Sequence, residues 1–119
     1  MTAGTSYRQG AVVLVPFPFT DQTGSKVRPA LVLSPDEFNL HHFDLILAAI
    51  TSQLPSVPDL ATEIRLDPSD VASGRIKQAS IIKVSKLFTC EAGLIHRQVA
   101  ALHPDKLREV LIAVRALFS

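Results

Sequence analysis

The sequence has little of what an extracellular, zinc-bound or membrane-spanning protein requires. Its 119 residues include one cysteine, no tryptophan and one tyrosine. The lone Cys90 excludes an internal disulfide and a multi-cysteine zinc site. No apolar run approaches the roughly 20 residues that cross a bilayer, so we expect no membrane partner. Residues 1–10 also lack the apolar centre of a signal peptide, and we therefore expect a cytoplasmic protein.

A strong excess of charge of either sign is also missing. Twelve Lys and Arg residues face eleven Asp and Glu residues, which gives a formal net charge of +1. A protein that holds duplex DNA by charge alone is more basic than this, so any nucleic-acid site must be a local, salt-sensitive patch. The length and the 47% of hydrophobic residues predict one globular domain, residues 1–119, with a single core.

Hydrophobic patterning predicts a mainly β fold. Short β-branched or alternating runs predict five or six strands. The first begins at residue 11 and ends in a Pro- and Phe-rich stretch before residue 20, and the others span 28–34, 43–51, 62–66, 79–84 and 94–102. Residues 52–60 contain two prolines and should form a loop, while 35–39 and 68–74 read as turns or single helical turns. Residues 104–118 form the one convincing helix, because Pro104 suits its first turn and an apolar stripe follows at helical spacing. Together these elements predict a strongly bent sheet or partly open barrel with a terminal helix.

The most informative stretch is Gly-Ser-Lys-Val-Arg-Pro-Ala-Leu-Val-Leu-Ser at residues 24–34. Pro29 lacks an N–H and keeps Arg28 out of the helical region, so Arg28 belongs at the start of a strand. Its guanidinium then projects from the rim of a rigid sheet beside the polar turn 20–26. Such a fixed cation suits a phosphate group. The alternative is an ordinary solvated arginine at a strand start.

The order of several segments resembles the MazF/PemK family of toxin ribonucleases over roughly residues 9–118. The matching segments are Gly-Ala-Val-Val-Leu-Val at 10–15, Arg-Pro-Ala-Leu-Val-Leu-Ser at 28–34, Asn39, Ala-Ala-Ile-Thr-Ser-Gln at 48–53, the Ser-Ile-Ile strand from residue 80 to Leu-Phe-Thr at 87–89, and the terminal helix. The Arg-Pro-Ala-Leu-Val-Leu-Ser and Ile-Thr-Ser-Gln segments, in this order and separation, make the resemblance specific.

The resemblance implies a small SH3-like barrel of the MazF/CcdB-like toxin fold and a symmetric homodimer. It also implies the toxin of a type II toxin–antitoxin pair, an mRNA interferase that cleaves single-stranded RNA sequence-selectively without a metal or other cofactor. A cognate antitoxin would bind over the active groove, and DNA would be contacted only indirectly, through that antitoxin. No His or Cys cluster in the sequence has metal-ligand spacing, which agrees with this expectation.

The resemblance carries the catalytic roles to Arg28 and Thr51. In metal-free cleavage the 2′-hydroxyl attacks its own phosphodiester, and negative charge gathers on oxygen in the transition state. A cation beside a hydroxyl donor would stabilise that charge, although Thr51 alone would be read as a strand-end residue that caps the next turn. Ser52 and Asp21 are further candidates for catalysis or substrate binding. Asp21 could accept the proton, or simply form a turn.

RNA-binding candidates flank this pair. Phe17 or Phe19 could stack a base, with the other ring directed into the core. Gln53 carries an amide suited to a base edge, and Lys26 and Lys86 could hold phosphates together with Lys77 and Lys83. Each lysine alone is more often a solvated side chain. His41 and His42 have suitable chemistry for proton transfer, but we expect them to be solvated.

Two departures from the family pattern bear on activity. Ala79 stands where relatives commonly have Asp, and Lys86 stands where they often have Gln, which predicts altered base preference or reduced activity. Three other functions stay open. They are a non-enzymatic, CcdB-like gyrase poison, a degenerate toxin that keeps only antitoxin binding, and an SH3-like adaptor for proline-rich peptides, for which the chain has few exposed aromatic residues.

Overall fold

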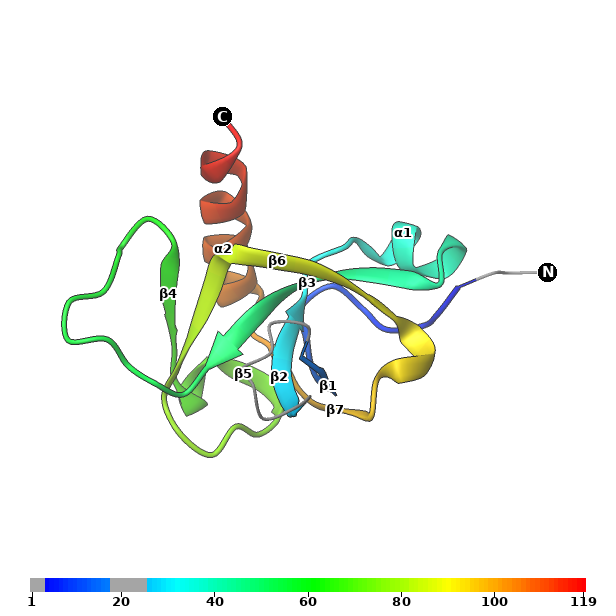
Figure 1. The fold of residues 1–119 in the computed structure, drawn as a ribbon, viewed down its shortest axis with the longest axis horizontal. Coiled ribbons are helices and arrows are strands. Elements are labelled where there is room, and N and C mark those ends of the chain that lie inside the picture. Colours follow the sequence, from blue (N-terminus) through cyan, green and yellow to red (C-terminus); the bar gives the residue numbers. More distant parts are fainter. Residues whose placement is uncertain (1–3, 18–25) are drawn as a thin grey trace.

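Seven strands form one antiparallel sheet in this computed structural model, which describes residues 4–17 and 26–119 (Figure 1). The strands are β1 (Ala11–Pro16), β2 (Val27–Val32), β3 (Asp44–Thr51), β4 (Glu63–Leu66), β5 (Val71–Gly74), β6 (Ser80–Glu91) and β7 (Arg97–Leu102). Their order across the sheet is β4-β6-β3-β2-β1-β7-β5. The helices are α1 (Asp36–His41) and α2 (Pro104–Leu117), with 3₁₀ turns at Pro68–Asp70 and Ala92–Leu94.

The chain connectivity forces this sheet to curl. Strands β4 and β5 lie at opposite edges, and a flat sheet would hold them about 29 Å apart across six inter-strand spacings. Only residues 67–70 connect the two strands, and such a link spans at most about 18 Å from Leu66 to Val71. The edges must therefore approach each other, which gives the half-barrel seen in Figure 1.

Alternation of side chains buries both faces of the sheet. One face, with Val12, Leu31, Ile50 and Ile82, packs beneath α2, which contributes the fully buried Val110. This packing confirms the terminal helix that the apolar stripe predicts, although the helix ends at Leu117 rather than at 118. The larger core of the molecule thus lies inside the curl, under α2.

The opposite face of the sheet holds a second apolar cluster, which includes Val13, Val32 and Leu47 and is covered by Tyr7, Phe88 and Ile95. A buried polar contact fixes its edge. The fully buried Asn39 of α1 donates to the carbonyls of Tyr7 (2.9 Å) and Ser34 (3.0 Å), and it accepts the Ser34 hydroxyl at 2.6 Å. Asn39 therefore ties the N-terminal segment and the β2–α1 connection to the sheet.

The predicted mainly β fold is confirmed, with differences at three elements. Residues 71–74 form strand β5 rather than part of a turn, because an exposed edge strand gives no apolar alternation to detect. Strand β6 runs on to Glu91, past the predicted end at residue 84, and β7 starts at Arg97 rather than at residue 94. Residues 36–39 belong to the short α1, which Pro35 precedes as its N-cap, as the alternative of a helical turn predicts.

Neither helix in the described part of the chain is long and apolar enough to cross a membrane.

Candidate functional site: a basic groove at the ends of β2 and β3

An open groove of about 930 Å³ lies where β2 begins and β3 ends. Its floor is apolar and includes Val12, Leu14, Ile50, Leu66 and Val99. Its polar lining residues are Lys26, Arg28, Thr51, Ser52, Arg75, Lys77, Gln78, Ser80 and Arg97. The groove therefore combines an apolar floor with basic, hydroxyl and amide groups from four stretches of the described chain, 26–28, 51–52, 75–80 and residue 97.

Strand register brings Arg28 and Thr51 to the same place. Ala30 pairs with Ala49 in the antiparallel β2–β3 ladder. Continuing that register two residues outward sets Arg28 opposite Thr51, and residues directly opposite in such a ladder share a face. Both side chains are half-buried. The pair that the sequence resemblance identifies is thus brought together at one end of the groove.

An aromatic pair supports the Arg28 guanidinium. Its central carbon lies 5.5 Å from the centre of the Phe17 ring, within cation–π range. Phe17 in turn meets Phe88 edge-on, with ring centres 5.9 Å apart and planes at 77°. The Phe17 N–H donates to the Lys26 carbonyl at 2.9 Å, which fixes the end of β1 against the start of β2. Phe17 is half-buried in these contacts, so its position suits holding Arg28 at least as well as stacking a base.

The Thr51 hydroxyl has one partner in the described structure. It accepts the Gln53 N–H at 3.1 Å, which is the turn-capping contact that the alternative reading of Thr51 predicts. A hydroxyl that accepts one hydrogen bond still has its own proton to donate. The cap therefore orients the Thr51 side chain and leaves it able to donate to a phosphate oxygen. Ser52 follows at the groove and is exposed.

Among the described residues, five cations line the groove, at Lys26, Arg28, Arg75, Lys77 and Arg97, and no acidic residue does. None of the five forms an ion pair with a carboxylate of residues 4–17 or 26–119. All except Arg28 are classed as exposed, and Arg28 is half-buried. A concave surface of this kind attracts anions and concentrates positive potential over its floor.

Arg75 and Arg97 are lining residues that the sequence reasoning missed. Arg75 directly follows Gly74, the last residue of β5, and Arg97 opens β7, the neighbouring strand. The two arginines are 22 positions apart in sequence, and only the β5–β7 pairing brings their strands together. The one usable signal was Arg75-Ile76-Lys77, which alternates cations around an apolar residue just before a predicted strand.

Other predicted residues do not line the groove. Gln53 and Lys86 are exposed and lie outside its lining, so their predicted contacts with RNA stay predictions. Lys83 instead approaches Glu63 at 3.9 Å. Asp21 and Phe19 lie outside the described residues.

The two neighbouring histidines are exposed and held by α1 itself. His42 Nδ1 lies 2.9 Å from the Phe38 carbonyl, and His41 Nε2 lies 3.4 Å from Glu37. Neither ring belongs to the groove lining, which agrees with their predicted solvated role. Within the described ranges no three His, Cys, Asp or Glu side chains gather closely enough to hold a metal ion.

Solved structures share this fold. The chain is similar to the Mycobacterium tuberculosis toxin MazF-mt6, with 21% identity, a TM-score of 0.70, and coverage of 91% of this chain and 95% of that one. It is also similar to an endoribonuclease from Mycobacterial species in complex with its cognate antitoxin, with 14% identity, a TM-score of 0.74 and 94% coverage of both chains. A MazE–MazF structure from Deinococcus radiodurans gives 23% identity, a TM-score of 0.71, and coverage of 96% and 97%.

The curled sheet with its C-terminal helix is thus a MazF-like fold. A comparison with curated proteins finds no significant match. The family model described as the PemK-like, MazF-like toxin of type II toxin–antitoxin systems matches residues 8–118, nearly the whole sequence. This chain therefore belongs to the PemK/MazF-like toxin family.

Proposed function

We propose that this chain is a sequence-selective, metal-independent endoribonuclease, the toxin of a type II pair, and that residues 1–119 act as one toxin domain. The observation that carries the proposal is the position of Arg28 and Thr51 at one end of a groove whose described lining has five cations and no carboxylate. Family membership supports it, as do the solved relatives of the same fold that are called endoribonucleases.

The proposed reaction uses the substrate's own 2′-hydroxyl as nucleophile. This oxygen bonds to the adjacent phosphorus while the bond from phosphorus to the 5′-oxygen breaks, which leaves a 2′,3′-cyclic phosphate and a 5′-hydroxyl. Arg28 would bind the non-bridging oxygens as their charge grows, because its planar fork matches two oxygens at once. Thr51 would donate a neutral hydrogen bond to the same phosphate. We assign no general base, because a guanidinium stays protonated and no carboxylate is among the lining residues of the ranges 4–17 and 26–119, a part of the chain that does not include the candidate Asp21.

The decisive experiment is incubation of the purified protein with mixed single-stranded RNA in excess EDTA, followed by mapping of the product ends. We expect cleavage to persist and to leave cyclic phosphate and 5′-hydroxyl ends. Loss of cleavage on chelation, with recovery on addition of magnesium, would contradict the proposed mechanism. Absence of cleavage under any condition would favour the gyrase-poison or degenerate-toxin alternatives.

We propose two protein partners for this chain. The first is a cognate antitoxin that covers the groove, since solved relatives are complexes with antitoxins. A small acidic reading frame beside this gene would support it, because the groove would attract acidic side chains.

The second partner is another copy of the chain. The apolar Ile112, Leu117 and Phe118 are 57%, 41% and 73% exposed near the end of α2, and a twofold partner could cover them together with part of the sheet. Sedimentation at micromolar concentration should show a dimer, and a monomer there would contradict this proposal.

A further inference from the structure

The segment between β5 and β6, residues 75–79, is anchored to the barrel at three points. The Arg75 N–H donates to the Val99 carbonyl at 3.1 Å, and Ile76 packs against the core beneath α2. At the other end the Ser80 hydroxyl, in a side chain that is 8% exposed overall, donates to the Gln78 carbonyl at 3.2 Å. The segment is therefore held in one shape, which reduces the entropy lost when a ligand binds.

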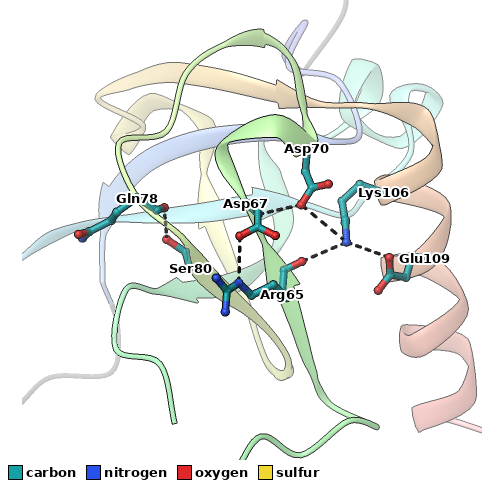
Figure 2. A network of polar contacts seen from close by, with 7 residues as sticks. All are labelled: Arg65, Asp67, Asp70, Gln78, Ser80, Lys106 and Glu109. Carbon is teal, nitrogen blue, oxygen red and sulfur yellow. Dashed lines mark hydrogen bonds and ion pairs between the residues drawn. The ribbon is translucent and has the colours of Figure 1, made fainter. Parts of the chain in front are cut away.

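The side chains that this segment leaves free are an arginine, a lysine and an amide. Arg75, Lys77 and Gln78 are exposed and line the groove, whereas Ile76 between them points to the core. Figure 2 shows the Gln78 side chain directed away from the ion pairs around Lys106. Its amide has no hydrogen-bond partner in the described part of the chain, so one donor group and one acceptor group face the groove together.

Arg97 extends this basic surface along the next strand. It shares a face with Val99, two residues away, and both line the groove. Since the Arg75 N–H is bonded to the Val99 carbonyl, two residues along β7 from Arg97, the two arginines border the same stretch of the groove. The apolar Leu14 of β1 lies opposite Arg97 of β7 in the sheet and continues the apolar floor of the groove.

We propose that this end of the groove is a nucleotide-binding subsite in which Arg75 and Arg97 hold phosphates that flank the scissile one. A base lies on the floor formed by Leu14, Ile76 and Val99, and the Gln78 amide reads its edge. The inference rests on the proposed ribonuclease function for its substrate, single-stranded RNA. It names Gln78 as a residue that determines sequence preference, in place of the exposed Gln53 outside the groove. An amide that donates and accepts side by side can distinguish one base edge from another.

The first test measures binding rather than cleavage. The full-length protein is titrated with a mixture of short 2′-fluoro single-stranded RNAs, which lack the nucleophilic 2′-hydroxyl, at several salt concentrations. Arg75→Gln and Arg97→Gln should each weaken binding about tenfold and lower the slope of log affinity against log salt by about 0.7. The matched control is Arg115→Gln, which removes an exposed cation from the last turn of α2 and should leave both quantities unchanged.

The second test sequences the RNAs that each variant retains from the same mixture. Gln78→Ala should relax the preference for one base by about tenfold or more, while Gln53→Ala should retain the wild-type preference. Circular dichroism melts check that each variant folds, and Gln78→Glu gives a second variant because it exchanges the donor group for an acceptor and should change the preferred base.

The outcomes separate this subsite from the proposed catalysis. If wild type binds the uncleavable RNA in an Arg75- and Arg97-dependent way but cuts no RNA, the subsite stands and the enzyme proposal fails. If both arginine variants bind like wild type, or if Gln53→Ala relaxes the preference and Gln78→Ala does not, the subsite is overturned.

Discussion

Basic side chains are used in opposite ways on two parts of this molecule. Between β4 and α2, Lys106 is 15% exposed and lies 2.9 Å from Glu109 and 3.8 Å from Asp70, and it donates to the Arg65 carbonyl at 3.1 Å (Figure 2). Arg65 itself contacts Asp67 at 3.0 Å. In the groove, by contrast, the five lining cations have no carboxylate partner among residues 4–17 and 26–119.

This difference separates cations that stabilise the fold through ion pairs from cations that remain available to bind an anionic ligand. A nearly neutral chain can still contain a strongly positive site if its carboxylates are gathered elsewhere. Here the turn Pro68–Asp70 and the first turns of α2 hold several of the acidic groups, so that the charged side chains in the described lining of the groove are all positive. Loss of a groove cation should therefore reduce function and spare stability, while loss of a paired cation should do the reverse.

The largest effect is expected for Arg28→Ala. We predict a loss of cleavage of roughly a hundredfold or more, the scale for removal of one group that stabilises transition-state charge. Arg28→Lys should behave nearly like alanine, because an ammonium loses the two-point grip on phosphate. Thr51→Ala should lose less, since it removes a neutral hydrogen bond. Initial rates on a fixed RNA give the comparison, and retention of activity in Arg28→Ala would remove Arg28 from the proposed mechanism.

Gly74→Ala should distort the groove because it changes the backbone that positions Arg75. Gly74 has a positive φ of 68°, and an added Cβ would clash with the Val99 carbonyl oxygen. The β5–β7 pairing that positions Arg75 must then shift, at a cost of about 2 kcal/mol or more. We expect the thermal midpoint to fall by roughly 8 °C. The control is Gly93→Ala, where the nearest atom to an added Cβ is Glu91 Oε1 at 4.0 Å, and an equal fall there would contradict the steric argument.

Lys106→Met tests the prediction that a cation paired with carboxylates stabilises the fold. It leaves the Arg65 carbonyl and the Asp70 carboxylate without this donor, so we expect a loss of about 1–2 kcal/mol in the free energy of unfolding. Urea titration measures it, with Arg108→Met as control, because Arg108 is 72% exposed and its pair with Asp105 contributes little. RNA cleavage by the folded Lys106→Met protein should match wild type. A selective loss of cleavage would erase the distinction between the two groups of cations.

The smallest effect concerns Cys90, on the sheet face away from α2. Burial raises the pKa of its thiol, and the nearby carboxylates of Asp44 and Glu91 raise it further. A higher pKa leaves less thiolate at a given pH, so alkylation of the native protein near pH 8 should be slower than in urea. Mass spectrometry of iodoacetamide adducts follows both rates. Equal rates in the two conditions would show that this second cluster opens freely.

Much of the fold could be read from local patterns. The β-branched runs predict β1 to β3, and Pro104 with its apolar stripe predicts α2, because burial on one face imposes a period that is visible in sequence. Strand β5 could not be found in this way. Its Val-Ala-Ser-Gly sequence is mostly exposed, and it becomes a strand only because β7 offers an open edge.

The candidate site divides in the same manner. Arg28 could be identified from the proline that follows it and from the family resemblance, and Thr51 from that resemblance alone. Arg75 and Gln78, in the segment before β6, and Arg97, at the start of β7, could not, since none of them shares a motif with Arg28. Gln53, the amide of the Ile-Thr-Ser-Gln segment, lies outside the lining of the groove. Its N–H is bonded to the Thr51 hydroxyl in the turn that follows β3.

The sequence by itself determined most of the strands, the terminal helix and the family, since these depend on local propensity and on short ordered motifs. Only the tertiary structure decided which cations share a groove and which are neutralised by carboxylates. The short link between β4 and β5 curls the sheet, and that curl draws the ends of β2, β3, β5 and β7 around one floor. Electrostatic character depends on distances in space, and these distances are fixed only when the sheet closes.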